Sequence, residues 1–130
     1  MILDSSAILA VLFEEEGNER LVDALEGADV VGIGAPTLIE TGIVAVKVFD
    51  LHGRSLVAQF LERWNVVVVP FGGRHERAAL DAFIRYGKGR HPARLNLGDC
   101  MSYATASIAG EPLLFVDNDF AQTDLTPAVA

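Results

Sequence analysis

Short apolar runs that alternate with helical patterns constrain the fold of this chain more strongly than any other feature of its sequence. Between these runs, apolar residues recur at the spacing of a helix. Strands that alternate with helices form a parallel sheet covered on both faces, so the sequence predicts a single α/β domain with α/β/α layers. The strands are expected within residues 1–3, 29–36, 65–71 and 111–119.

Helical segments are expected after Asp4 and within residues 16–27, 36–50, 54–64, 74–87 and 98–110. The helix at 36–50 carries apolar residues on most of its faces, so we expect it to be largely buried, with Glu40 inside it. The β-branched run at 65–71 is expected to form a buried strand. The last residues, 126–130, are expected to form a loose tail.

Length and composition favour one soluble domain that spans residues 1–130. The chain is 51% hydrophobic and 22% charged, which is typical of a globular protein. Cys100 is the only cysteine, so an internal disulfide is impossible and a reducing, cytoplasmic location is expected. The N-terminal apolar run lacks a basic segment and is interrupted by Asp4, which argues against a signal peptide and a membrane span.

The distribution of charge matters more than its sum. A net charge of -8 argues against a nucleic-acid partner, since such binders neutralise phosphates with basic patches. Residues 82–98, however, contain no Asp or Glu, and four basic residues lie there: Arg85, Lys88, Arg90 and Arg94. One basic island therefore stands in an acidic protein, directly before Asp99.

Five carboxylates occupy positions where a parallel sheet would bring them together. Asp4 follows the first strand, Asp117 and Asp119 follow the last, Asp99 starts a helix, and Glu40 lies one turn into another. Ligands bind beyond the carboxyl ends of such strands. Crowded carboxylates repel one another unless a cation lies between them, and oxygen ligands select hard cations. The pattern therefore indicates Mg²⁺, with Mn²⁺ as a substitute.

Each acid also has a simpler interpretation. Asp4 and Asp99 are suited to cap helices, and Asp117 and Asp119 to form turns. Glu40 would face solvent near Lys47 if its helix turned that way. Ser6 lacks a histidine partner for nucleophilic chemistry, so we expect it to hydrogen-bond the backbone or to position Asp4.

Four segments together resemble the PIN-domain ribonucleases of the VapC toxin type: "ILDSSAILA", "PTLIETGIV", "YGKGRHPARLNLGDCMSYATA" and "PLLFVDNDFAQTD". The resemblance covers nearly the whole chain. It implies a compact α/β/α fold and a Mg²⁺-dependent endoribonuclease that acts on transfer or ribosomal RNA and inhibits translation. It also implies a toxin that is neutralised by a cognate VapB-type antitoxin and that forms a homodimer.

The resemblance assigns roles to individual residues. Asp4, Glu40 and Asp99 fall on three family acids, and Asp117 matches the fourth, with Asp119 as the alternative. Of these acids, the resemblance makes Asp4, Asp99 and Asp117 the expected metal ligands, and it places Ser6 on the small hydroxyl residue after the first acid. We expect Lys88, Arg90 and Arg94 to hold the RNA backbone.

Two other functions compete with this one. A catalytically silent RNA-binding or regulatory module on the same fold is the main alternative, although the retained acids argue against it. A receiver-type phosphorylation domain would need a lysine after a late strand. Lys47 and Lys88 are the only lysines, and neither follows an expected strand.

Overall fold

A computed structural model describes residues 1–129 as one sheet of parallel strands between two helical layers. The strands are β1 (Ile2–Leu3), β2 (Gly32–Gly34), β3 (Val67–Val69) and β4 (Leu113–Leu114). Their order in the sheet is β3-β2-β1-β4, with β1 in the interior. Ile2 of β1 lies opposite Gly32 of β2 on one side and Leu113 of β4 on the other.

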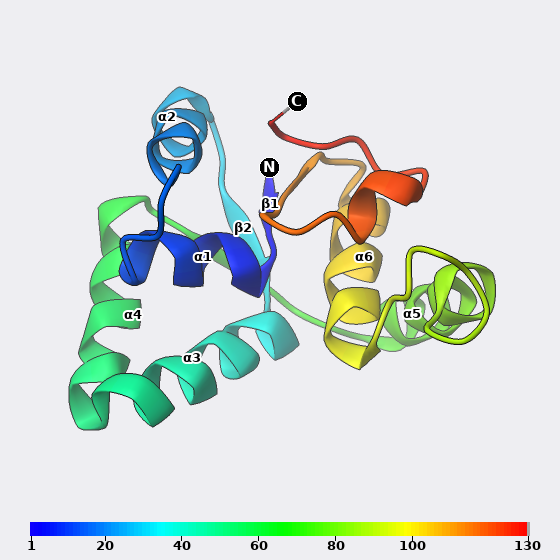
Figure 1. Ribbon diagram of the computed structural model, residues 1–130, viewed down its shortest axis with the longest axis horizontal. Coiled ribbons are helices and arrows are strands. Elements are labelled where there is room, and N and C mark those ends of the chain that lie inside the picture. The colour runs from blue at the N-terminus through cyan, green and yellow to red at the C-terminus, as the bar shows by residue number, and fades with distance from the viewer. Residues whose placement is uncertain (130) are drawn as a thin grey trace.

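Helices cover both faces of this sheet, and the expected α/β/α fold is confirmed. They are α1 (Ser5–Leu12), α2 (Glu19–Gly27), α3 (Ala35–Phe49), α4 (Leu51–Arg63), α5 (Gly73–Tyr86) and α6 (Leu97–Ala109), followed by the short 3-10 helix η1 (Phe120–Gln122). The helices α1 to α4 lie on one side of the strands, and α5 and α6 lie on the other (Figure 1). Within residues 1–129, none is long and apolar enough to cross a lipid bilayer.

The sheet separates two apolar cores, because successive side chains of a strand point to opposite faces. Ile2 and Leu113 pack against α5 and α6, whereas Leu3 and Leu114 pack against α1, α2 and α4. All four side chains are at most 4% exposed. Burial on both faces holds β1 and β4 side by side and so fixes where their carboxyl ends lie.

Two expectations about burial were wrong. The strand β3 lies at the edge of the sheet, and Val67 and Val68 are 53% and 44% exposed, because an outermost strand has a neighbour on one side only. The helix α3 is not largely buried. Its residues Ile39 and Ile43 are 64% and 52% exposed, because they lie four residues apart on the face that points away from the sheet.

The expected loose tail is instead attached to the edge of the sheet. Leu113 donates its N–H to the Thr126 carbonyl at 3.0 Å and accepts from the Ala128 N–H at 2.8 Å. The chain from Thr126 to Ala128 therefore runs along the free edge of β4, where Figure 1 shows it in red. Residue 130 lies outside the described residues.

The helices α3 and α4 pack with their backbones in contact. Asp50 joins them with a positive φ of 54°, which turns the chain sharply. A Cβ at Gly53 would collide with the Ala45 carbonyl and lie 2.8 Å from Val46 N. Only a glycine at position 53 allows this close approach.

Candidate active site

The acids gather at the carboxyl ends of the two adjacent strands β1 and β4. Asp4 directly follows β1, and Asp117 lies three residues beyond the end of β4. Leu3 pairs with Leu114, so the two chains leave the sheet at the same level. The first turn of α6 brings Asp99 to the same edge.

Three carboxylates form the acidic cluster: Asp99, Asp117 and Asp119. Each offers one carboxylate oxygen, and these oxygens all lie within 4.8 Å of one another. Asp119 thus belongs to the cluster together with Asp117, and the structure does not make them exclusive alternatives. Phe120, fully buried beside Asp119, anchors this turn in the core.

Asp4 is only 3% exposed and lies close enough for its charge to act on Asp99 and Asp117 of the acidic cluster. It is the N-cap of α1, and its Oδ2 accepts from the Ser6 N–H at 3.1 Å and from the Ser6 hydroxyl at 2.5 Å. The Ser6 Oγ also accepts from the Val116 N–H at 3.2 Å. Ser6 therefore ties Asp4 to the segment that carries Asp117.

Asp99 is held by a reciprocal capping box at the start of α6. Asp99 Oδ2 accepts from the Asn96 N–H at 3.0 Å, and Asn96 Oδ1 accepts from the Asp99 N–H at 2.9 Å. Asn96, rather than Asp99, is the N-cap. Sequence reasoning missed Asn96, although its spacing of three residues from an acid is a recognisable capping signal.

The capping and metal-binding interpretations of these acids are compatible. Asp4 and Asp99 each use one oxygen for a local backbone N–H, and Asp117 Oδ1 likewise accepts from the Asp119 N–H at 3.2 Å. A carboxylate has about four acceptor positions in all. Each acid is therefore oriented by its own turn while at least one acceptor position remains available.

The electrostatics of the site favour a cation. Burial raises the pKa of Asp99 to about 7, the Asn96 N–H opposes this, and the charges of Asp4, Asp117 and Asp119 add to it. Burial also raises the pKa of Asp117, with Asp4 and Asp119 contributing. A donor set made only of carboxylate oxygens suits a hard divalent ion, so the residues present fit such a metal.

Glu40 lies beside the acidic cluster and not within it. Its carboxylate sits against Gly98 in the first turn of α6, where a Cβ would overlap Oε2. Glu40 is half-buried, and within residues 1–129 it forms no ion pair with Lys47. A carboxylate near the first turn of a helix interacts favourably with the helix dipole.

The basic residues lie on an ordered loop between α5 and α6. Gly87 and Leu95 form a β-bridge that closes this loop, and Ala93 and Leu95 are fully buried beneath it. Lys88, Arg90 and Arg94 are exposed and form no ion pair within the described part of the chain. By contrast, Arg85 pairs with Asp124 at 3.7 Å, so it is less free to bind a phosphate.

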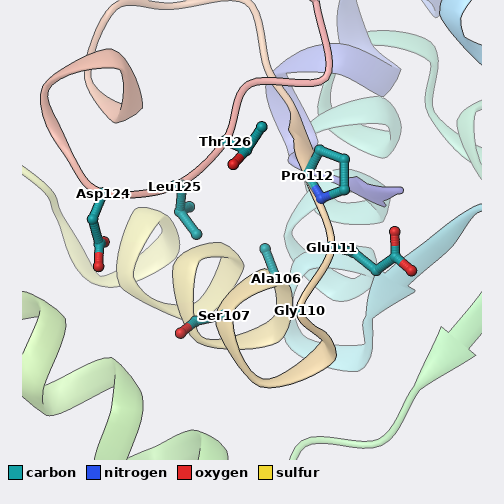
Figure 2. Close-up of a pocket in the computed structure, with 8 residues that line it drawn as sticks. All are labelled: Ala106, Ser107, Gly110, Glu111, Pro112, Asp124, Leu125 and Thr126. Carbon is teal, nitrogen blue, oxygen red and sulfur yellow. The ribbon is translucent and has the colours of Figure 1, made fainter.

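A separate hollow of about 320 Å³ lies at the opposite end of α6 (Figure 2). It is bounded by Ser107 of that helix and its C-cap Gly110, by Pro112 before β4, and by Leu125 and Thr126 near the C-terminus. This hollow faces the amino ends of the strands. It is therefore remote from the acids.

The sequence matches the PIN domain family over residues 1–125. Ribonuclease VapC36 of Mycobacterium tuberculosis is 44% identical over 126 residues, which cover 96% of this chain and 91% of VapC36. The chain belongs to the PIN-domain family and, within it, to the VapC ribonucleases. The resemblance seen in the sequence motifs is thereby confirmed, and this VapC protein is an endoribonuclease of the toxin class.

Solved structures support the fold of this VapC protein. Mycobacterium tuberculosis VapC20, a sarcin-ricin loop cleaving toxin, matches with a TM-score of 0.79 at 17% identity, covering 99% of this chain and 98% of VapC20. VapBC2 from Rickettsia felis, bound to a DNA fragment from their promoter, matches with a TM-score of 0.76 at 12% identity, covering 97% and 94%. At these identities the two matches establish the fold alone.

Proposed function

We propose that this VapC protein is a Mg²⁺-dependent endoribonuclease whose metal is held by Asp4, Asp99 and Asp117, with Asp119 beside them. The observation that carries the proposal is the acidic cluster, three carboxylates from two distant chain segments with oxygens within 4.8 Å of one another. Mn²⁺ is expected to substitute, because it accepts the same oxygen ligands.

Different groups of the site have different roles in phosphodiester hydrolysis. Bound metal supplies charge stabilisation at the phosphoryl oxygens and lowers the pKa of water. Either Glu40 or Asp117 accepts one proton of the attacking water, whose oxygen forms the new bond to phosphorus, and the other acid completes the metal site. The phosphorus–O3′ bond breaks and O3′ takes up a proton from solvent, so the products carry a 5′-phosphate and a 3′-hydroxyl.

The basic loop attracts the RNA backbone, which the acids repel. Lys88, Arg90 and Arg94 are exposed on the loop that leads into α6, whose first turn holds Asp99. Cations there counteract the repulsion between an acidic site and the RNA backbone. The substrate is a transfer or ribosomal RNA loop, because proteins that read RNA sequence favour exposed single-stranded loops.

An antitoxin partner of the VapB type and a second copy of the chain complete the proposal. An antitoxin arginine that reached the acidic cluster would form charge-assisted hydrogen bonds with its carboxylates. The exposed apolar side chains of α3, Ile39 and Ile43 among them, suit a homodimer contact. Co-expression with the neighbouring small open reading frame should yield a complex of toxin and antitoxin. A toxin that is purified alone from such cells would contradict the antitoxin proposal.

The catalytic assignment is tested with purified protein, transfer RNA and a ribosomal RNA loop. Cleavage should require Mg²⁺, stop with EDTA, and fall to background for Asp99→Asn. Asp23→Asn on the exposed surface of α2 is the matched control and should cleave normally. Tight RNA binding without any product would favour the silent binding module instead. Sequencing the 5′ ends of the fragments identifies the target.

A further inference from the structure

A buried chain of hydroxyl groups, formed by Thr37 and Ser102, ends at Asp4. Ser102 Oγ donates to Asp4 Oδ1 at 2.7 Å, and Thr37 Oγ1 lies 3.2 Å from Ser102 Oγ. Both hydroxyl residues are at most 1% exposed. Nothing in the assignment of the acids requires these groups, yet burying a polar side chain is unfavourable unless it is hydrogen-bonded.

The donor and acceptor in each hydrogen bond of the hydroxyl chain follow from counting hydrogens. A hydroxyl has one hydrogen to donate, and Ser102 gives its hydrogen to the Asp4 carboxylate. Ser102 must therefore accept from Thr37, so the donors run from Thr37 to Ser102 to Asp4. Hydrogen bonds aligned in this way strengthen one another in a buried setting.

The hydroxyl chain joins the elements that carry the other acids. Thr37 lies three residues before Glu40 on α3, and Ser102 lies three residues after Asp99 on α6. Residues three apart share a face of a helix. One hydrogen-bonded chain thus fixes the faces of α3 and α6 relative to the carboxylate that follows β1.

The hydroxyl chain also determines how the Asp4 carboxylate is oriented. Two of its acceptor positions, both on Oδ2, are taken by Ser6, and Ser102 takes a third on Oδ1. The one position that remains is on Oδ1. We propose that Ser102 and Thr37 are positioning residues, which hold Asp4 Oδ1 at the orientation in which it meets a divalent cation. This inference rests on the proposed role of Asp4 as a metal ligand.

Calorimetric titration of the metal-free protein with Mn²⁺ measures metal affinity and so tests the proposal without measuring cleavage. Ser102→Ala should weaken Mn²⁺ affinity by about ten- to a hundredfold, the range for partners that orient a metal ligand. Thr37→Val, which preserves shape, should weaken it a few-fold, and Thr37→Ser should restore it. Adding Thr37→Val to Ser102→Ala should cause little further loss, because the two groups act through one bond.

Two further variants separate the possible failures. Thr105→Val removes an equally buried hydroxyl on α6 that bonds Met101 O at 3.0 Å, so it should change thermal stability alone. Asp4→Asn should weaken Mn²⁺ binding strongly. Unchanged affinity in Asp4→Asn would refute Asp4 as a ligand. If Mn²⁺ affinity is weakened in Asp4→Asn but unchanged in Ser102→Ala, only the role of the hydroxyl chain is refuted. If Ser102→Ala does not fold, an unchanged Mn²⁺ affinity in Thr37→Val refutes that role as well.

Discussion

The carboxylate of Glu40 occupies the space that a side chain at Gly98 would need. An ideal Cβ at position 98 would overlap Oε2 and lie 3.1 Å from both Cδ and Oε1 of Glu40. The position of this acid therefore depends on the absence of a side chain one residue before Asp99.

Replacement of Gly98 by Ala should displace Glu40. We expect Gly98→Ala to change stability little, because the carboxylate at the end of the flexible Glu40 side chain can move aside, and to lower the cleavage rate by about 10²-fold if Glu40 moves by about 1 Å. Gly73→Ala is the matched control, since its Cβ would lie 3.7 Å from Arg77 Nη1, an ordinary contact. Equal cleavage rates in the two variants would count against the role of this contact.

The raised pKa of Asp99 predicts how the stability of the metal-free protein depends on pH. Its pKa in the folded state is about 7, against an ordinary value of 3.8. Between these values the folded chain binds more protons than the unfolded chain, so its free energy of unfolding decreases as pH rises. In EDTA, thermal unfolding should therefore occur at lower temperature at pH 7.5 than at pH about 5.

Metal affinity should show the opposite trend with pH, because ligands must lose their protons before a cation binds. We expect Mn²⁺ affinity and cleavage to increase as pH rises through about 7, the pKa of Asp99. Asp99→Asn retains a side-chain oxygen for the capping box and should flatten the stability profile in EDTA. A profile that keeps its slope in this variant would assign the pH dependence to another group.

Asp117 and Asp119 should contribute unequally. Both charges raise the pKa of Asp99, and the contribution of Asp117 is the larger. We expect Asp117→Asn to reduce Mn²⁺ affinity more than Asp119→Asn and to shift the pH midpoint of binding further downwards. Calorimetric titrations at several pH values measure both quantities. The reverse order would identify Asp119 as the more important ligand.

The basic loop should affect RNA binding and leave metal binding unchanged. Replacing Lys88, Arg90 or Arg94 singly by Ala should flatten the salt dependence of RNA affinity, by about 0.7–0.9 in the logarithmic slope for each phosphate that is no longer neutralised. Lys47→Ala on α3 is the control. Binding to labelled RNA at several salt concentrations gives the slopes. A weaker Mn²⁺ affinity in Arg94→Ala would show that the loop also supports the acids.

The two helical glycines Gly42 and Gly53 should respond oppositely to alanine. Gly53→Ala forces α3 and α4 apart at the Ala45 carbonyl and should lower stability by about 1–3 kcal/mol. Gly42 has no atom within 4 Å of its ideal Cβ, so Gly42→Ala should raise stability by about 0.5–1 kcal/mol. Chemical denaturation of both variants provides the comparison, and similar shifts would refute the close helix contact.

The order of strands and helices could be predicted from the sequence because each depends on a local pattern. Apolar runs followed by acids located β1 and β4, and helical spacing located α2 and α5. Exposure could not be predicted in this way, since the run at Val67–Val69 looks the same in a central strand and in the edge strand that β3 is. Which face of α3 is covered likewise depends on distant segments.

The acids of the site could be proposed from the sequence, whereas the groups that orient them could not. A carboxylate after a strand is a visible signal. Thr37 and Ser102 lie among small residues in ordinary helices, and their relation to Asp4 exists only once three elements have packed together. Gly98 is likewise inconspicuous until Glu40 is placed against it.

The adjacency of β1 and β4 has a consequence for the synthesis of this toxin. The ribosome makes β1 first, but the neighbour that brings Asp117 and Asp119 to Asp4 is among the last described segments to be translated. A nascent chain that ends before residue 113 lacks both this strand and two of the clustered acids. Pairing of such distant segments is slow and requires both to be present. The nuclease centre can therefore be complete only after nearly all of the described residues have been translated.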